Sequence, residues 1–238
     1  MYIDFHTHII PEIDDGAKDI DTALEMLSVA HVCGADTVVL TPHVSSSDNF
    51  SKFVKTRDAK IDLLKEKLRQ EWQPCPEILR GAEVSLDGSL SERKNVRDVC
   101  IEDTDLLLLE LPYTPWTSWY NNEIYNLISN HGVTPVMAHI ERYFKHPRDL
   151  KKLDTLVSFG VKFQVNASSF LTFSGRRIIR ELAAEGLVSA IGSDCHNLSR
   201  RSPDISRALR SFERKFGDDF LSHIYNKTSR LLEDSRIK

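Results

Sequence analysis

The sequence predicts an α/β fold in which parallel strands form a barrel. Seven apolar segments are expected to be strands, and helical patterns separate them along the chain. Val38-Val39-Leu40 and Leu106-Leu107-Leu108-Leu109 are apolar on both faces, as strands of a parallel sheet are when helices cover them. Because no Gly-x-Gly-x-x-Gly turn follows a strand, we interpret the units as a barrel closed by seven strands rather than an open nucleotide-binding sheet.

Each expected strand is a short apolar or alternating run bounded by turn or charged residues. In chain order they are Tyr2–Phe5, Thr37–Thr41, Glu77–Glu83, Asp105–Glu110, Thr134–Ala138, Val161–Asn166 and Val188–Gly192. Between the second and third, the segment Gln73-Pro74-Cys75-Pro76 is interpreted as a turn and not as a domain boundary.

The helical patterns lie between and after these strands. Asp19 can cap a helix that runs to Ala30, with Gly34 just past its end. A long charged helix carries an apolar stripe, made of Val54, Ile61, Leu64 and Leu68. Further helices are expected at Tyr120–Asn130, Arg148–Ser158, Arg176–Glu185, Asp204–Lys215 and Asp218–Leu232.

Composition limits the classes of protein that the chain can belong to. At 238 residues and 41% apolar content it can bury a sizeable core, and without a linker or repeat we expect one domain over residues 1–238. The net charge of -4 gives no basic field for nucleic acid. No segment approaches the roughly 20 apolar residues of a membrane span, and no signal-peptide pattern is visible. Four scattered cysteines fit reduced thiols, so we expect a cytoplasmic protein without membrane insertion.

Potential metal ligands follow almost every expected strand. His6 and His8 come directly after the first, and two imidazoles at i and i+2 of an extended chain point the same way. The others, in order along the chain, are Asp15, His43, Glu83, Glu110, His139, Asp194 and His196. Because the carboxyl ends of parallel strands share one rim of a barrel, we expect these side chains to meet there. His31, His131, His146 and His223 fall in or beside helices and are expected to be structural or exposed.

A single histidine or carboxylate of this kind is more often a hydrogen-bonded cap or a solvated charge than a ligand. Six strand ends with the same property favour a metal centre, because clustered carboxylates repel one another unless cations neutralise them. Mixed imidazole and carboxylate ligands suit Mn²⁺, Fe or Zn²⁺. The number of ligands implies two or three ions and at least one bridging carboxylate, an arrangement suited to hydrolysis at phosphorus. Arg142 and Arg201 are placed to bind phosphoryl oxygens. For each of them, a solvent-exposed charge without a specific function is an equally good interpretation.

This set of ligands resembles the PHP family, the polymerase and histidinol phosphatase superfamily of metal-dependent phosphoesterases. The segment from His6 to Ala17, with its Ile-Asp-Asp-Gly-Ala, is similar to the opening of the bacterial manganese-dependent tyrosine-protein phosphatases of capsule and exopolysaccharide synthesis. Further motifs match in order, namely Thr41-Pro42-His43, Gly81-Ala82-Glu83, His139-Ile140-Glu141-Arg142 and Ser193-Asp194-Cys195-His196-Asn197. The resemblance covers nearly the whole chain.

The resemblance implies a distorted (β/α)7 TIM-like barrel of PHP type with three metals. It implies a first ion on His6, His8, Glu83 and Asp194, a second on Glu83, Glu110 and His139, and a third on Asp15, His43 and His196. It assigns Arg142 and Arg201 to phosphate binding. The implied reaction is hydrolysis of protein phosphotyrosine by a metal-bridging hydroxide that attacks phosphorus. The implied partner is the phosphorylated tail of a bacterial tyrosine kinase that controls polysaccharide export.

The sequence departs from the family pattern at three positions that are not ligands. Glu12 stands where the family often has glycine, Val44 replaces a frequent histidine, and Ile140 replaces the proline of the usual His-Pro-Glu-Arg. These changes bear on loop shape and substrate fit. The aromatic segment Pro112–Tyr120, directly after Glu110, is equally compatible with contact to substrate and with packing beneath the loop.

Four alternatives remain open at this level. Cys195 and Arg201 form a Cys-x5-Arg pattern of cysteine-dependent phosphatases, but the residues between them include no glycine for a phosphate cradle. The same metals could act on a small phosphomonoester such as histidinol phosphate. An amidohydrolase also opens with His-x-His, but it usually has a lysine where Glu110 stands. A non-enzymatic docking module is the last alternative, and the full ligand set argues against it.

Overall fold

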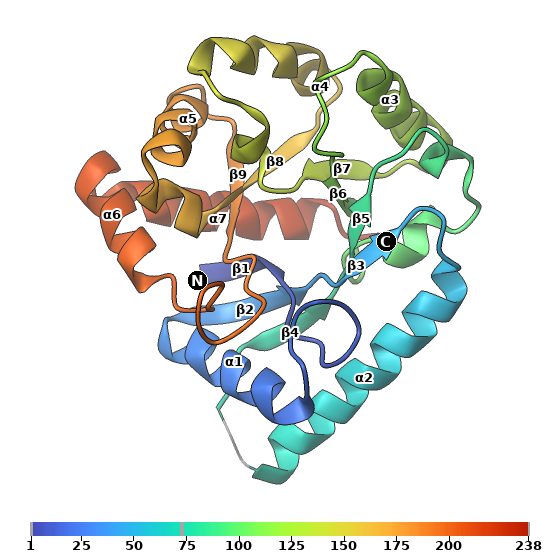
Figure 1. Cartoon of the computed structure of the whole chain (residues 1–238), viewed down its shortest axis with the longest axis vertical. Coiled ribbons are helices and arrows are strands. Elements are labelled where there is room, and N and C mark those ends of the chain that lie inside the picture. Colours follow the sequence, from blue (N-terminus) through green and yellow to red (C-terminus); the bar gives the residue numbers. More distant parts are fainter. Residues whose placement is uncertain (1, 72–73, 238) are drawn as a thin grey trace.

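Short parallel strands occupy the centre of the molecule, in the order that the sequence predicts (Figure 1). The computed structural model describes all residues except 1, 72–73 and 238. The strands are β1 (Tyr2–Thr7), β2 (Ala35–Leu40), β3 (His43–Ser45), β4 (Glu77–Arg80), β5 (Glu83–Ser85), β6 (Leu106–Glu110), β7 (Thr134–Met137), β8 (Lys162–Asn166) and β9 (Val188–Gly192). Every expected strand coincides with at least one of them, and the parallel α/β class is confirmed.

The strands differ from the expected ones at two places. A short strand that was not expected, β3, follows the second beyond Pro42, and the third breaks between Arg80 and Glu83 into β4 and β5. Proline has no N–H to donate to a ladder, which accounts for the gap between β2 and β3. As a result the strands pair in two sheets, with the orders β1-β2-β4 and β3-β5-β6-β7-β8-β9.

Regular pairing that closes a barrel is not found among the described residues. Between β9 and β1 there is an isolated parallel bridge, Thr7 to Cys195, flanked by two backbone hydrogen bonds. His8 N–H donates to the carbonyl of Cys195 at 2.9 Å, and Asp194 N–H donates to the carbonyl of His6 at 2.8 Å. The strands therefore form a TIM-like ring in which β9 and β1 are joined only near their carboxyl ends.

Helices surround this ring (Figure 1). They are α1 (Ile20–Val32), α2 (Phe50–Glu71), α3 (Trp119–His131), α4 (Asp154–Ser158), α5 (Phe173–Ala184), α6 (Ser206–Phe216) and α7 (Asp218–Asp234). The Asp19 side chain accepts a hydrogen bond from Thr22 N–H at 2.8 Å, which confirms the predicted cap of α1. None of the helices in the described part of the chain has the length and apolar character needed to cross a bilayer.

The helix expected over Arg148–Ser158 is only partly correct. Residues Pro147–Leu153 form a 3-10 helix, and only Asp154–Ser158 is α-helical. Leu150, Leu153 and Leu156 are buried. Because side chains at positions i and i+3 of a 3-10 helix lie on the same side, a spacing of three residues brings these apolar side chains together.

The apolar interior has two parts. A large cluster lies between the strands and the surrounding helices. A smaller cluster includes Ile3, Phe5, Leu106, Leu108 and Val136 from strands of both sheets, and Leu231 and Leu232 of α7 pack against it. Helix α7 thus covers the amino ends of the strands, where the Thr228 hydroxyl donates to Ser189 O at 3.0 Å. The opposite rim, at the carboxyl ends, is left for polar side chains.

Candidate metal centre

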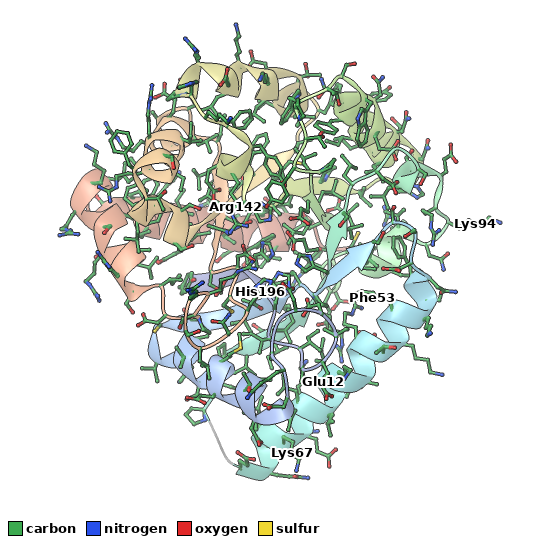
Figure 2. The ribbon with its side chains drawn as sticks, viewed as in Figure 1. Glu12, Phe53, Lys67, Lys94, Arg142 and His196 are labelled. Atoms are coloured by element: carbon green, nitrogen blue, oxygen red, sulfur yellow. The ribbon has the colours of Figure 1, made fainter. Side chains whose placement is uncertain are left out.

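The side chains predicted as metal ligands converge at the carboxyl ends of the strands. His6 lies at the end of β1, His43 and Glu83 begin β3 and β5, and Glu110 ends β6. His8, Asp15, His139, Asp194 and His196 lie on the segments that follow β1, β7 and β9. Figure 2 shows Arg142 and His196 near the middle of the ring of helices, although they are far apart in the sequence.

His6 and His8 present their Nε2 atoms to the same place, 3.0 Å apart. The two imidazoles therefore point the same way, as predicted, with their ring planes tilted by 45°. Because successive side chains of a strand face opposite sides, consecutive residues can serve different functions. Phe5 belongs to the smaller apolar cluster, while the next side chain, His6, belongs to the polar centre.

Glu83 is the common neighbour of the centre. Its Oε1 lies 2.9 Å from His139 Nε2. Its Oε2 lies 3.2 Å from His6 Nε2, 3.4 Å from His8 Nε2 and 3.0 Å from His43 Nδ1. Because the two carboxylate oxygens face different imidazoles, Glu83 has the placement required of a bridging ligand. Glu110 extends the same side of the centre, with its Oε1 3.5 Å from His139 Nε2.

Asp194 and Asp15 complete two further parts of the centre. Asp194 Oδ1 lies 3.8 Å from His6 Nε2 and 3.6 Å from His8 Nε2. Asp15 Oδ1 lies 3.2 Å from His196 Nε2 and 3.6 Å from His43 Nε2. Asp15 is exposed whereas Asp194 is buried, so the Asp15 side of the centre is the one that opens to solvent.

The donor atoms form three overlapping groups of metal-binding size. They are His6, His8 and Asp194; His43, Glu83 and Glu110; and His8, Asp15, His43 and His196. Buried Glu83 Oε2 and His196 Nε2 contact other ionisable groups of the centre, at 3.0 Å to His43 Nδ1 and 3.2 Å to Asp15 Oδ1, but lack well-aligned hydrogen-bond partners among the described residues. Buried polar atoms without partners are costly unless an ion satisfies them, so these residues fit divalent cations.

Two of these residues adopt a backbone conformation that side chains rarely take. His139 has φ 32° and Asp194 has φ 53°, both in the left-handed region. Each lies two residues beyond the end of a strand, at the point where the chain turns at the rim. Strain of roughly 1–3 kcal/mol per residue is typical of functional sites.

The electrostatics of the centre follow from close packing of imidazoles and carboxylates. Burial alone would lower the pKa of His6, but Glu83 and Asp194 raise it to about 9. Burial also opposes protonation of His43, and its hydrogen bond to Glu83 nevertheless raises the pKa to about 9. Burial would raise the pKa of Glu83, but the imidazoles, His6 foremost, hold it well below its usual range. Without metal, protons on the imidazoles therefore neutralise the carboxylate.

A pH dependence of stability follows for the metal-free protein. His6 and His43 have folded pKa values near 9, above the roughly 6.5 of an unfolded histidine. Raised values stabilise the folded state below the unfolded pKa, and this contribution is lost as pH rises through the folded pKa. We expect the melting temperature of chelated protein to fall between pH 6.5 and 9, and His6→Gln to weaken that fall. Manganese-loaded protein should show no such fall, since metals bind neutral imidazoles. A melting temperature of chelated protein that increases over this range would contradict the assignment.

Arg142 and Arg201 both reach the centre through Asp194. Arg142 NH2 lies 2.8 Å from Asp194 Oδ2, and Arg201 NH2 donates to Asp194 Oδ1. Both guanidinium groups are partly exposed, so each can also meet a ligand that enters from solvent. Burial would raise the pKa of Asp194, but His6, Arg142 and the other cations around it hold it below its usual range.

Three positioning residues were not predicted from the sequence. Asp14 Oδ2 accepts from His8 Nδ1 at 2.8 Å and from His43 N–H at 3.0 Å. Gln164 Oε1 lies 3.2 Å from His6 Nδ1, and Asn166 Nδ2 donates to Asp194 Oδ2 at 2.6 Å. Such contacts fix the orientation of a ligand and leave its other atom for a metal. The available signal was the pair of amides at i and i+2 on β8, the strand with no predicted ligand.

The loop after β1 explains part of the Ile-Asp-Asp-Gly-Ala motif. A side chain at Gly16 would place its Cβ 2.8 Å from His8 Cβ, closer than real contacts, so only glycine fits beside the ligand. Glu12 has φ 55°, a conformation that favours glycine. The family preference for glycine at this position therefore has a steric reason, and Glu12 occupies it under strain.

Cys195 has none of the properties of a nucleophile. Its side chain is fully buried, and burial raises the pKa of the thiol far above its usual value. The guanidinium of Arg201 donates to Asp194, so the Cys-x5-Arg spacing does not form the phosphate-binding loop of a cysteine-dependent phosphatase.

Cys195→Ser is expected to leave turnover nearly intact, because the thiol faces the interior and not the rim. The buried hydroxyl should lower the free energy of unfolding by about 1–3 kcal/mol. Steady-state kinetics and a urea melt on the same preparation measure both. Loss of activity with metal content unchanged would restore the cysteine mechanism.

The aromatic segment Pro112–Tyr120 contains both packed and exposed rings. Tyr120 is buried, and Trp116 packs against it and against Phe144, with ring centroids 5.5 and 5.6 Å apart. Tyr113 is 64% exposed and lies beside the centre, stacked 5.2 Å from Tyr143 and 6.3 Å from His139. Only Tyr113 is therefore placed to meet a ligand.

Comparison with known proteins gives a consistent picture. A family model described as capsular polysaccharide synthesis, CpsB/CapC, matches residues 2–233. The tyrosine-protein phosphatase YwqE of Bacillus subtilis is 29% identical over 239 residues, covering 99% of this chain and 93% of the relative.

Solved structures agree with this relationship. The crystal structures of YwqE from Bacillus subtilis and CpsB from Streptococcus pneumoniae, described as unique metal-dependent tyrosine phosphatases, provide a match with TM-score 0.82 and 27% identity, covering 99% of this chain and 96% of the other. A putative histidinol phosphatase from Listeria monocytogenes matches with TM-score 0.53 and 14% identity, covering 90% of this chain and 99% of the other, which shows a shared fold.

Proposed function

The chain belongs to the CpsB/CapC family of capsular polysaccharide synthesis, and on this premise we propose that it is a metal-dependent phosphatase that hydrolyses phosphotyrosine in proteins. The observation that carries the proposal is the convergence of imidazoles and carboxylates from six strand ends around Glu83. A matching pair of solved structures, those of YwqE and CpsB, is also described as metal-dependent tyrosine phosphatases.

We propose three metal sites within this donor set. His6, His8, Asp194 and Glu83 would hold one ion, Glu83, Glu110 and His139 a second, and Asp15, His43 and His196 a third. His43 lies close to both of the last two groups, at 3.0 Å from Glu83 and 3.6 Å from Asp15. We propose Mn²⁺, for which mixed nitrogen and oxygen ligands are suitable. Divalent ions held there supply the Lewis acidity that ionises water near neutral pH.

Besides the metal ligands, the two arginines are the side chains that we propose act on the substrate. Arg142 and Arg201 flank Asp194 with partly exposed guanidinium groups, so they can bind the phosphoryl oxygens and stabilise the charge that develops on them. The leaving group is a phenolate with a pKa near 10, which needs less protonation than the alkoxide of phosphoserine. The centre thus favours phosphotyrosine chemically as well as sterically.

Tyr113 provides a surface for the substrate ring. Its stacking partner Tyr143 is anchored by a hydrogen bond from its hydroxyl to Leu111 O at 2.7 Å. Arg142 interacts with the Tyr113 hydroxyl, which links the aromatic surface to the phosphate-binding group. A phenyl ring whose phosphate reaches Arg142 would lie against this exposed ring.

Tyr113→Ala is expected to reduce the preference for phosphotyrosine over phosphoserine peptide by about 3- to 10-fold, the usual value of one aromatic contact. Tyr113→Phe should retain the preference, because it keeps the ring and loses only the hydroxyl. The measurement is kcat/KM for both peptides with each variant. An unchanged ratio in Tyr113→Ala would show that the ring does not contact substrate.

By the family relationship, we propose a bacterial tyrosine kinase tail as the protein substrate and the cytoplasm as the place of action. A short flexible tail fits a centre that opens to solvent on the Asp15 side. The proposal therefore concerns an exposed phosphotyrosine and not one within a folded domain.

The deciding experiment compares three substrates with purified protein: phosphotyrosine peptide, phosphoserine peptide and histidinol phosphate. We expect phosphotyrosine to be hydrolysed best, activity to disappear on chelation, and Mn²⁺ to restore it. Activity undiminished after chelation, with metal removal verified by elemental analysis, would overturn the metal mechanism. Preference for histidinol phosphate would instead overturn the substrate class and leave the mechanism standing.

A further inference from the structure

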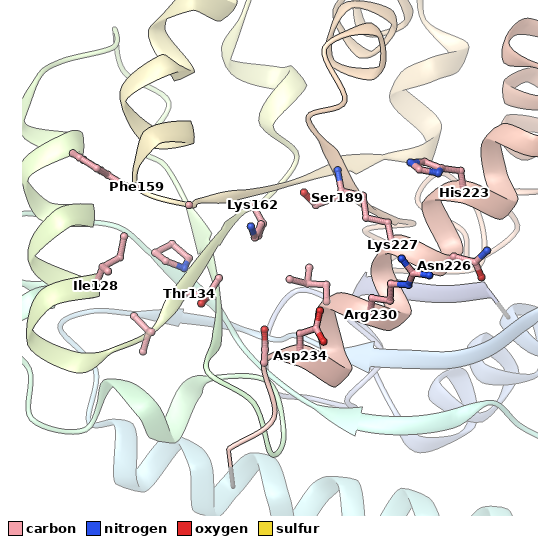
Figure 3. A pocket seen from close by; sticks show the side chains of 15 residues that line it. Ile128, Thr134, Phe159, Lys162, Ser189, His223, Asn226, Lys227, Arg230 and Asp234 are labelled. Atoms are coloured by element: carbon pink, nitrogen blue, oxygen red, sulfur yellow. The ribbon is translucent and has the colours of Figure 1, made fainter.

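A second cavity lies at the end of the strands opposite to the metal centre. It has a volume of about 690 Å³, within the usual range for small-molecule sites, roughly 300–1,000 Å³. Thr134, Lys162 and Ser189, at or near the starts of β7, β8 and β9, contribute to its wall, and α7 forms one side (Figure 3). The five residues of β8 span about 16 Å at roughly 3.3 Å each, so Lys162 and the rim residue Asn166 are well separated.

One end of this cavity is cationic. Lys162, His223, Lys227 and Arg230 line it together with a single carboxylate, Asp234. No ion pair involves any of these five side chains within the described residues. Basic side chains that outnumber the carboxylates of a concave wall repel one another, and an anion relieves that repulsion.

Lys227 is held in place as a donor. Its Nζ donates to Gly186 O and to Val188 O, both at 2.8 Å. An ammonium has three N–H donors, so one remains after these two contacts. Burial lowers the pKa of Lys227, and the neighbouring charge of Lys162 lowers it further, as expected for two cations near each other.

The other end of the cavity is apolar. Ile128 of α3 and Phe159, just after α4, lie across from the basic residues of α7 in Figure 3. Val133, Pro135 and Leu231 also line the cavity. Phe159 is partly exposed and is supported from behind by Tyr125, with ring centroids 5.4 Å apart. The cavity therefore combines an aromatic and apolar wall with a set of cations.

We propose that this cavity binds an organic phosphate with an aromatic ring, of the size and charge of a nucleoside diphosphate. The phosphate oxygens would meet Lys162, Lys227 and Arg230, and the ring would lie against Phe159 and Ile128. The proposal concerns binding and not a reaction, because none of the groups of potential metal ligands found among the described residues lines the cavity. The site is independent of the phosphatase proposal, since it uses none of the same residues.

The test measures binding of α,β-methylene-ADP, whose bridging bond resists hydrolysis, to the metal-loaded protein by calorimetry. Adenosine is the probe that has the aromatic ring without the phosphates. Inorganic pyrophosphate is the probe that has the phosphates without the ring. We expect each to bind at least about tenfold more weakly than α,β-methylene-ADP, because each retains only one of the two contacts. Equal binding of pyrophosphate would overturn the aromatic part of the proposal.

Lys162→Glu and Arg230→Glu are each expected to weaken binding at least about tenfold and to leave kcat and KM for phosphotyrosine peptide unchanged. Lys94→Glu, an exposed charge at the edge of the molecule in Figure 2, is the matched control and should bind normally. Lys162→Gln and Arg230→Gln give the same comparison without charge reversal, should either reversal fail to fold. Binding that is lost instead in Arg142→Ala would place the nucleotide at the metal centre and overturn the proposal.

Discussion

Replacing Glu83 by glutamine is expected to lower turnover of a phosphotyrosine peptide by about 10³-fold or more. Glu83 is the one side chain whose two oxygens face His139 on one side and His6, His8 and His43 on the other. The substitution keeps its size but removes the negative charge and one oxygen. Metal ions stabilise such transition states by several kcal/mol, and about 4 kcal/mol corresponds to three decades in rate.

The measurement is kcat together with metal content by elemental analysis, since Glu83→Gln should also lose metal. Glu77→Gln provides the control, because Glu77 is an exposed carboxylate at the start of β4, six residues before Glu83, which begins β5. It should retain both metal and activity. Circular dichroism verifies that each variant is folded. Near-normal turnover in Glu83→Gln would show that Glu83 does not bridge the centre.

Removal of either arginine is expected to lower kcat/KM by about 10²- to 10³-fold, the usual effect of losing one donor to a developing oxyanion. Arg142→Ala and Arg201→Ala should keep their metal, because neither side chain offers a ligand atom. Inhibition by inorganic phosphate should weaken in parallel with activity. Lysine at either position should restore only part of the activity, since it lacks the planar pair of donors.

Because both arginines contact Asp194, they could act by positioning this carboxylate instead of binding phosphate. Metal content separates the two roles. Loss of metal in proportion to activity would contradict phosphate binding and assign both residues to Asp194. Arg200→Ala is the control for Arg201, because Arg200 is exposed and next in the chain and makes no ion pair within the described residues.

The sequence predicted the strands well because their signal is local. Apolar runs such as Val188–Gly192 are buried on both faces and have little alternative to a central strand. The short strand β3 beyond Pro42 and the break after Arg80 were not predicted, because they depend on pairing with different neighbours: β4 pairs with β2, whereas β5 pairs with β3 and β6. The 3-10 geometry of Pro147–Leu153 was also missed, since patterns of three and of 3.6 residues are nearly the same over two turns.

The centre was partly predictable for a related reason. A donor at the end of a parallel strand is located by the topology alone, so His6, Glu83 and Asp194 could be expected to share a rim before any contact was known. Asp14, Gln164 and Asn166 could not be found in this way, because their importance lies in which ligand atom they bond. Which ligand atom each of them bonds depends on the register between neighbouring strands.

By itself the sequence determined the chemistry that this protein can carry out: which nitrogen and oxygen donors are present, and that alternating strands and helices bring them to one rim. Only the tertiary structure decided that Glu83 faces both sides of the centre, that Tyr113 is exposed while Trp116 is packed, and that the cations of α7 line a separate cavity. The physical reason is the separation along the chain over which each kind of interaction acts. Strand and helix periodicity act between near neighbours, whereas contacts such as that of His6 with Gln164 join residues 158 positions apart and exist only once the chain has folded.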